Sequence, residues 1–262
     1  MARIGILGVG TIAEAVVRAM CARPGNSDEF ILSPRSASRS TRLAEEFDNC
    51  RRVESNQAVV DAADIVVLSM RPQELDEALD GLTFREDQVI ASFIAALPPS
   101  QVAELTAPAT RACQLIPLPA IEMHKGPLVI CPAIPEVLEA FNGLGDLVVL
   151  DDESRIRVLS CASAIMSTYY EAQNRVIGWI ADQGIAPETA SLYIRSELEG
   201  LAAVGKSTPE DRRDDLPAEH QTPGGLNERV RAGLLEQGWF DALIGQIDGI
   251  YRNAVLRRPD AD

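Results

Sequence analysis

The chain of 262 residues has no paired cysteines, little positive charge and no long apolar run. Its five cysteines are scattered, odd in number and free of any Cys-x-x-Cys pair, which argues against metal ligation and against a disulfide framework. Lys and Arg total 24 against 39 Asp and Glu, a formal net charge of −15. Nucleic acids and anionic membranes need a positive surface, so neither is an expected partner. A small anionic ligand needs only a local positive pocket and is compatible with this charge balance.

A membrane-spanning helix and a secretion signal are also missing from the sequence. No apolar run reaches the roughly 20 residues that cross a bilayer. The start, Met1-Ala2-Arg3, leads straight into an apolar stretch without the layout of a signal peptide. We therefore expect a cytoplasmic protein with reduced thiols and no membrane partner.

The first part of the chain alternates short apolar runs with amphipathic segments, which is typical of βαβ units and a parallel sheet. Parallel strands are covered on both faces and are therefore continuously apolar in sequence. The predicted strands, the last two at an edge, are residues 3–8, 30–33, 65–70, 88–93, 112–116, 126–132 and 146–150. Four helices are predicted in this part. The first follows the first strand, the second spans 38–47, the third precedes Ile65 and the fourth spans 99–105.

Beyond Leu150 the apolar residues recur at helical intervals. One continuous helix is predicted over 152–183, with Asp151 or Asp152 as its cap and Gly184 at its end. The further predictions are a helix from Pro187 toward Gly205, a loop over 206–221, a helix from Leu226 and a last helix from Trp239 to Arg257. Apolar residues lie all around the long helix, so we expect it to pack against a second copy of the chain.

Together these patterns predict an α/β fold in two parts. Residues 1–150 form a Rossmann-type, doubly wound parallel sheet, and residues 151–262 form an all-α dimerisation domain. No internal repeat or low-complexity tract interrupts either part. The expected assembly is a homodimer or a higher homo-oligomer.

A glycine motif, GVGTIA, lies between the first predicted strand and the first helix. This context is typical of a dinucleotide-binding turn, although a glycine turn without a ligand is the alternative. Gly8 permits the tight turn, Gly10 lets a pyrophosphate approach the backbone, and Ala13 lets the helix pack on the strand. The amides of Thr11, Ile12 and Ala13 would face the phosphates at the positive end of the helix.

The end of the second predicted strand indicates which dinucleotide is bound. NAD sites carry an acidic residue there, which accepts hydrogen bonds from the ribose hydroxyls. Here the sequence is Leu-Ser-Pro-Arg-Ser, without a carboxylate. Ser33 and Arg35, with Ser36 or Arg39 as further donors, suit the 2′-phosphate of NADP, because a guanidinium binds phosphate through a charged fork. We therefore predict NADP (NADPH) as the cofactor.

Six stretches, spread over almost the whole chain, resemble motifs of one family, the pyrroline-5-carboxylate reductases. They are IGILGVGTIAEAV, SPRS, VVLSMRPQ, SFIAALP, QLIPLPAIEMHKG and QTPGGLNERVRAGLLEQGW. Members of this family use NAD(P)H to reduce a cyclic imine to proline. The resemblance implies a nucleotide-binding domain, a helical dimerisation domain and a role in proline biosynthesis.

The resemblance also implies further cofactor-binding residues. Ser69, Met70, Arg71 and Pro72 fall at the family's Lys-Pro-Gln motif, whose backbone borders the ribose of the cofactor. Ala95 falls in the segment that the family places near the nicotinamide.

The predicted substrate loop is Thr222-Pro223-Gly224-Gly225, which resembles the family's Ser-Pro-Gly-Gly loop. It leads into a helix, so the amides around Thr222, Gly224 and Gly225 are expected to bind a substrate carboxylate. Asn227 aligns with the threonine that protonates the imine in the family. An amide can orient a substrate but is a poor proton donor.

Two further departures from the family lie on the substrate side. Leu118 replaces the family's asparagine, and residues 162–168, which lack the glycine-rich start of the family's long helix, are expected to be helical throughout. A proton source other than Asn227 is therefore needed, and it is either water or a titratable side chain. The candidate side chains are His124, His220, Tyr169, Tyr170 and Glu171.

The predicted function is that of an NADP-dependent oxidoreductase. It transfers a hydride from NADPH to the C=N bond of a small cyclic imine acid, with Asn227 and Thr222 as catalytic residues and without a metal. Two alternatives stay open. One is a reductase of the same fold with another acceptor, a ketone or a deazaflavin, and the other is a dinucleotide-binding protein without turnover.

Overall fold

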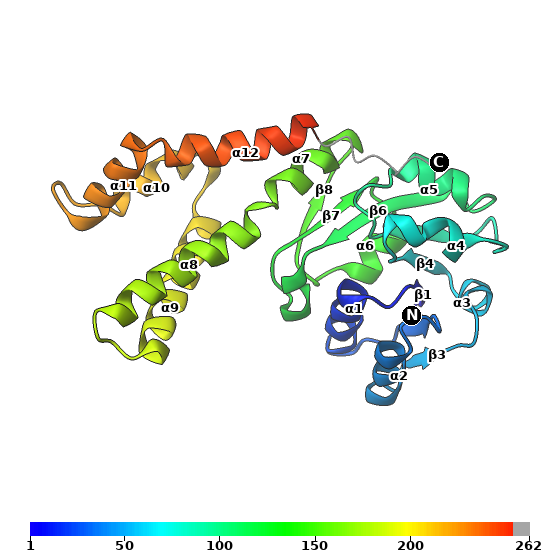
Figure 1. Cartoon of the computed structure of the whole chain (residues 1–262). Helices are drawn as coiled ribbons and strands as arrows, with labels where there is room; N and C mark the ends of the chain where they lie inside the picture. Colours follow the sequence, from blue (N-terminus) through cyan, green and yellow to red (C-terminus); the bar gives the residue numbers. More distant parts are fainter. Residues whose placement is uncertain (254–262) are drawn as a thin grey trace. The chain divides into compact units, whose positions relative to one another are not determined.

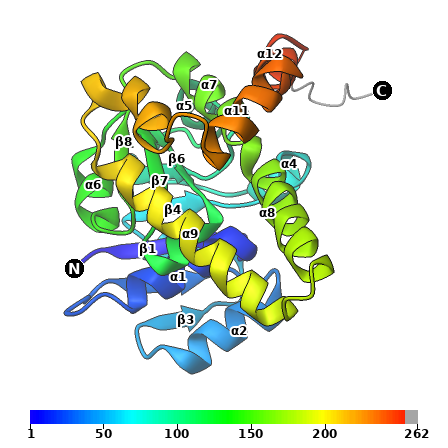
Figure 2. The same ribbon diagram turned by 90° about the vertical axis from the view of Figure 1, so that its left-hand side faces the viewer.

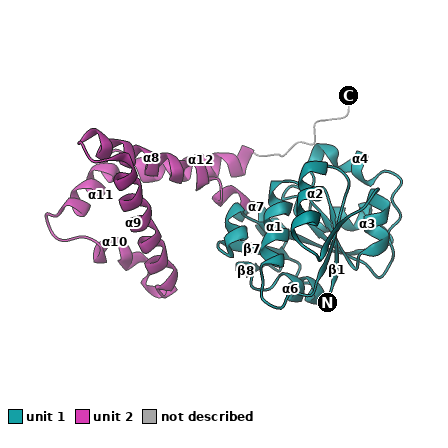
Figure 3. Ribbon diagram, turned by 90° about the horizontal axis from the view of Figure 1, so that it is seen from below, with its two compact units in different colours: residues 1–159, 256–262 teal, residues 160–255 magenta. Residues whose placement is uncertain are grey.

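The computed structural model describes residues 1–253 and divides the chain into two compact units (Figure 3). The first unit contains residues 1–159 and holds an eight-stranded sheet. The second unit begins at Ser160, inside helix α7 (Ser154–Ala162), and its described part is helical. The chain therefore changes from mixed to helical structure shortly after its last described strand, β8 (Asp146–Val149).

The sheet has the strand order β3-β2-β1-β4-β5-β6-β7-β8 (Figure 1). The strands are β1 (Arg3–Leu7), β2 (Glu29–Leu32), β3 (Cys50–Arg52), β4 (Ile65–Leu68), β5 (Val89–Ser92), β6 (Arg111–Pro117), β7 (Pro127–Cys131) and β8. Strands β1 to β6 run parallel in the order of a Rossmann sheet, which confirms the predicted fold class. The sequence does not predict β3, because this strand is short and two of its three residues are arginines.

The sheet is not parallel throughout, so one part of the prediction is wrong. Strand β7 is antiparallel to β6, and β8 is parallel to β7. Only residues 118–126, with the short helix η2 (Pro119–Met123), connect β6 to β7. A parallel pair needs a crossover of a dozen or more residues, and this connection is too short for one. The next crossover contains α6 (Pro135–Phe141), and it makes β7 and β8 parallel.

Helices cover both faces of the sheet. They are α1 (Thr11–Cys21), α2 (Ala37–Glu46), α3 (Asn56–Ala62), η1 (Pro72–Glu74), α4 (Leu75–Leu79), α5 (Pro99–Leu105) and α6. In β4, Ile65 and Val67 pack in the layer of α1 and α6, whereas Val66 and Leu68 pack in the layer of α3 and α5. Successive side chains of a strand point to opposite faces, so a doubly covered strand is apolar at every position.

After the end of α7, the described part of the second unit contains four longer helices with two short ones between them (Figure 2). They are α8 (Ile165–Asp182), α9 (Pro187–Ser207), η3 (Glu210–Asp215), α10 (Leu216–Glu219), α11 (Leu226–Glu236) and α12 (Trp239–Asn253). Helix α8 packs against α9, and α11 packs against α12. Helix α8 ends just before Gly184, as predicted, and Gly184 has the left-handed conformation. The predicted last helix extends to Arg257, and its residues 254–257 lie outside the described residues.

Two predictions for this region are wrong. The helix predicted over 152–183 is interrupted at Ser163, between α7 and α8. The Ser163 hydroxyl donates to the carbonyl of Ser160 at 2.7 Å, and such local bonds compete with the helical ladder. The loop predicted over 206–221 contains η3 and α10, since Pro217 fits the first turn of a helix. Among residues 1–253, no helix is both long and apolar enough to cross a membrane.

Candidate active site

The turn after β1 requires glycine at its first position. Gly8 has a φ of +89°, and a Cβ there would lie 2.5 Å from the carbonyl oxygen of Ser69. The Gly8 amide donates to the hydroxyl of Ser33 at 3.0 Å, and Ser33 is fully buried. Gly8 and Ser33 therefore fix the backbone where the carboxyl ends of the neighbouring strands β2, β1 and β4 lie.

The second glycine of the turn leaves room for a ligand. Gly10 precedes α1 with an extended backbone, and no atom of the described residues outside its own turn lies within 4 Å of the place that a Cβ would take. Gly10 has no side chain, so the N-cap position of α1 makes no side-chain capping hydrogen bond. Thr11 is exposed, Ile12 is half-buried and Ala13 is fully buried in the core. Uncapped amides at the positive end of a helix, beside an open cradle, fit the pyrophosphate of a dinucleotide.

Arg35, the predicted phosphate ligand, follows β2 and is half exposed and paired. Its Nη2 lies 3.2 Å from Oε1 of Glu74, and the same oxygen lies 2.7 Å from Nη2 of Arg71. The side chain and the backbone amide of Arg71 donate to Glu74 and, with the charge of Arg35, lower its pKa to about 2. The Glu74 carboxylate is therefore ionised at every physiological pH. No feature of the sequence links these residues, and the pairing is seen only in the structure.

The other predicted donors near β2 differ in their surroundings. Arg39 lies 3.2 Å from a carboxylate oxygen of Glu14, in the first turn of α1. Arg18 and Arg42 bind the same carboxylate. Ser36 is exposed and begins α2 in the left-handed conformation. Arg39 thus shares one carboxylate with two other guanidiniums, so it remains a candidate donor for a 2′-phosphate beside Arg35.

The segments predicted to border the ribose and the nicotinamide follow β4 and β5. Ser69 and Met70 are half-buried, whereas Arg71 and Pro72 are exposed. Ala95 is exposed, and its carbonyl accepts from Nε2 of Gln114 at 3.0 Å, as does that of Ile94 at 2.9 Å. The buried Gln114 therefore fixes the loop after β5. Sequence reasoning missed Gln114, although a glutamine inside an apolar strand is a detectable signal.

The predicted substrate loop lies in the second unit, before α11. Gly224 has a φ of +71°, and a Cβ on Gly225 would clash with the Thr222 hydroxyl. The Gly225 amide donates to the Thr222 carbonyl at 2.8 Å. These contacts define a tight turn that needs glycine at both positions.

Two polar groups at this loop already form hydrogen bonds within the chain. The Gly224 amide donates to Oε2 of Glu228 at 2.5 Å, so the chain's own carboxylate takes one amide predicted to bind substrate. Nδ2 of Asn227 donates to the carbonyl of His220 at 2.7 Å. Sequence reasoning missed Glu228, although a glutamate in the third position of a helix is a familiar capping signal.

The candidate proton donors lie at the surface, and several have local partners. The ring Nδ1 of His124 lies 3.2 Å from the backbone carbonyl oxygen of another residue, and the ring Nδ1 of His220 lies 2.8 Å from such an oxygen. Tyr169 and Tyr170 are exposed and contact each other edge to face, and Glu171 pairs with an arginine of its own helix. These surroundings do not single out one of the five as the acid. Leu118, which replaces the family's asparagine, is half-buried in the segment between β6 and β7.

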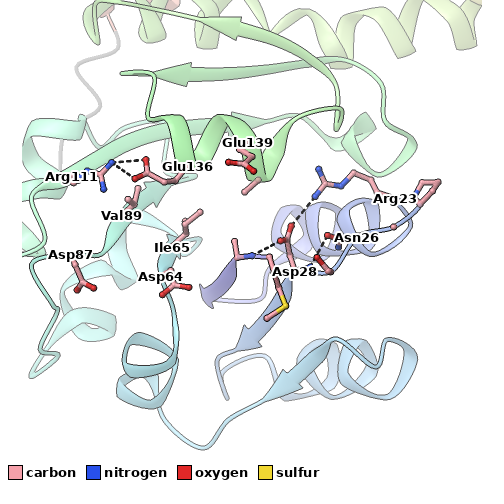
Figure 4. Close-up of a pocket in the computed structure, with 16 residues that line it drawn as sticks. Arg23, Asn26, Asp28, Asp64, Ile65, Asp87, Val89, Arg111, Glu136 and Glu139 are labelled. Atoms are coloured by element: carbon pink, nitrogen blue, oxygen red, sulfur yellow. Dashed lines mark hydrogen bonds and ion pairs between the residues drawn. The ribbon is translucent and has the colours of Figure 1, made fainter.

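A polar pocket of about 580 Å³ lies where the parallel strands begin, at the end of the sheet opposite the glycine turn (Figure 4). Ile65, Val89 and Arg111, the first residues of β4, β5 and β6, help to line it. Arg111 lies 2.7 Å from Glu136, and the figure shows further pairing of the lining charges. Ligands of open parallel sheets bind at the carboxyl ends of the strands, so this pocket is not the dinucleotide site.

The strand order, the glycine turn after β1 and the uncapped start of α1 define a Rossmann-type dinucleotide-binding protein. A family model described as NADP oxidoreductase coenzyme F420-dependent matches residues 3–99, which contain this turn. The class is therefore that of an NAD(P)-dependent oxidoreductase, with a pyridine nucleotide as cofactor.

Individual proteins that are similar to this chain specify the class of oxidoreductase further. A pyrroline-5-carboxylate reductase of Pseudomonas aeruginosa is 24% identical over 254 residues, which cover 93% of this chain and 92% of that protein. The 1-pyrroline-5-carboxylate reductase structure from Streptococcus pyogenes has a TM-score of 0.81 at 21% identity, covering 97% of this chain and 98% of that one. A Plasmodium falciparum pyrroline carboxylate reductase with NADP bound has a TM-score of 0.81 at 14% identity, covering 96% of each chain. The predicted resemblance to the pyrroline-5-carboxylate reductases is confirmed, and it extends over nearly the whole chain.

Proposed function

We propose that this protein transfers a hydride from NADPH to the carbon–nitrogen double bond of a small cyclic imine acid. Similarity to pyrroline-5-carboxylate reductases over nearly the whole chain supports a reductase that acts on C=N bonds. The observation that carries the proposal is the open cradle at Gly10 beside the uncapped amides of α1. When bound, the nicotinamide supplies the hydride, and the protein's task is placement.

NADPH is the proposed cofactor because of the residues after β2. The strand ends without a carboxylate that would accept from the ribose hydroxyls, and Arg35 follows within three residues of its end. In the proposal the amides around Gly10 hold the pyrophosphate, and Arg35 binds the 2′-phosphate. Ser33 supports the turn through the Gly8 amide, while residues 69–72 and Ala95 border the ribose and the nicotinamide.

The loop before α11 is proposed to bind the substrate. Amides at the start of a helix suit a carboxylate, which would replace Glu228 at the Gly224 amide. The side-chain amide of Asn227 has a second N–H besides the one bonded to His220, and this group orients the substrate. An amide has no acidic proton near neutral pH, so we assign the protonation to water or to another side chain.

A homodimer through the second unit is part of the proposal. Trp179, Leu192 and Tyr193 are 64%, 71% and 63% exposed, although all three are large and apolar or aromatic. Exposed apolar surface of this extent is typical of an interface between copies.

NADPH oxidation with a panel of acceptors tests the proposal. Turnover is expected with pyrroline-5-carboxylate or another cyclic imine acid. A deazaflavin reductase is the second candidate, favoured by the family-model match, although that match is confined to residues 3–99. Turnover with a deazaflavin or a ketone alone would select that candidate. Tight NADPH binding without any turnover would contradict both.

A further inference from the structure

Glu74 links two arginines at the edge of the sheet that contains the glycine turn. Arg35 follows β2, and Glu74 ends η1 after β4. Strands β2 and β4 lie on either side of β1 in the sheet. The ion pair between Arg35 and Glu74 therefore joins the two loops that flank the turn predicted to hold the dinucleotide.

We propose that Glu74 determines how strongly the site prefers NADPH to NADH, by competing with the 2′-phosphate for Arg35. The proposal rests on the proposed use of NADPH. A phosphate and a carboxylate repel each other at one guanidinium, so phosphate binding favours the separation of Arg35 from Glu74. NADH has no 2′-phosphate and leaves the pair intact. Glu74 thus weakens NADPH binding and has little effect on NADH.

The structure fixes Glu74 in this position independently of Arg35. Its Oε1 accepts from Nη2 of Arg71 at 2.7 Å, and its Oε2 accepts from the Arg71 amide at 3.3 Å. Its side chain is 22% exposed, against 49% for Arg35 and 78% for Arg71. The carboxylate is therefore the anchored member of the pair, and Arg35 is the member that can turn toward a ligand.

Glu74→Gln tests the proposal, because glutamine keeps an acceptor for Arg71 and removes the charge. Calorimetric titrations would use NADPH, NADH and adenosine 2′,5′-bisphosphate, which carries only the adenosine half of the cofactor. We expect NADPH and the bisphosphate to bind about three- to fivefold more tightly, and NADH to change less than about twofold. Glu77→Gln is the matched control, since Glu77 lies 3.8 Å from Arg35 but is 79% exposed. Its effect on NADPH is expected to stay within about twofold.

The outcomes separate this proposal from the proposed function. If the wild-type protein binds NADPH and Glu74→Gln does not tighten that binding, only the role of Glu74 is overturned. If Glu74→Gln lowers only the affinity for NADH, the carboxylate binds a ribose hydroxyl instead, and the proposed competition for Arg35 is overturned. If the wild-type protein binds neither nucleotide, the proposed function fails and the role of Glu74 fails with it. Melting temperatures of the variants show whether each remains folded.

Discussion

The two glycines of the turn after β1 have different roles at the scale of single residues. Gly8→Ala would force a methyl group against the Ser69 carbonyl at a φ of +89°, so we expect it to destabilise the fold by about 1–3 kcal/mol. Gly10→Ala meets open space, and we expect it to cost less than about 1 kcal/mol. The new methyl group would instead obstruct the pyrophosphate and weaken NADPH binding more than about tenfold.

Thermal denaturation and NADPH titration of the two variants check this division. A Gly10→Ala variant that binds NADPH as the wild type does would show that the cradle holds no phosphate. An unchanged melting temperature for Gly8→Ala would show that the turn tolerates a side chain.

Glu228 is the residue whose charge opposes the proposed substrate. Glu228→Gln keeps an acceptor for the Gly224 amide and removes the negative charge, so a substrate carboxylate would bind there more easily. We expect the KM of an imine acid to fall about threefold, a change of the size of one exposed charge interaction. The KM of a cyclic imine without a carboxylate is the control and is expected to stay constant. Equal effects on both substrates would exclude the Gly224 amide as the carboxylate anchor.

At the scale of elements, the start of α1 carries a partly buried charge cluster. The Glu14 side chain is 13% exposed and binds Arg18, Arg39 and Arg42. Burial raises the pKa of Glu14, but hydrogen bonds from Arg42 and Arg18 outweigh it and lower the pKa below the ordinary value. A carboxyl group with a lowered folded-state pKa contributes stability above its unfolded pKa, and that contribution is lost as pH falls through the folded pKa.

We therefore expect Glu14→Gln to reduce the free energy of unfolding by about 1–2 kcal/mol at neutral pH. The difference from the wild type should shrink in acid, once the wild-type carboxyl is protonated. Urea denaturation of both proteins at neutral and acid pH measures this. A difference that stays constant with pH would show that packing, rather than charge, accounts for the loss.

Local elements could be predicted from the sequence, whereas contacts between distant elements could not. The run of β1, the glycine turn and α1 is contiguous, so its apolar pattern and its glycines reveal it. The antiparallel β7 and the pairing of Arg35 with Glu74 depend on which strands become neighbours. Cys21 and Cys50 are scattered in the sequence, yet their sulfur atoms lie 3.7 Å apart. The break at Ser163 was missed because one serine does not exclude a helix.

At the scale of the whole molecule, the second unit has too little core of its own. In its described part, the buried side chains are Cys161, Gln173, Ala190 and Ile194. The first unit, by contrast, buries two continuous apolar layers. A unit that buries so few side chains is stabilised by another surface, which in the proposal is that of a second copy.

Leu192→Glu tests this assembly, because Leu192 is 71% exposed on α9 and a charge there would be buried in a dimer. We expect the wild type to sediment as a dimer or a larger oligomer and the variant to dissociate more readily. Leu147→Glu is the control on the first unit, where Leu147 is 41% exposed. A wild-type monomer at micromolar concentration would contradict the proposal.

Calorimetry of the purified chain with NADPH and NADH tests most directly whether the turn after β1 binds a pyridine dinucleotide. The predicted result is one NADPH bound per chain, more tightly than NADH. Arg35→Ala should weaken NADPH more than about tenfold and change NADH less than about twofold, because only NADPH carries the phosphate that a guanidinium recognises. Absence of heat with both nucleotides would contradict a dinucleotide site at this turn.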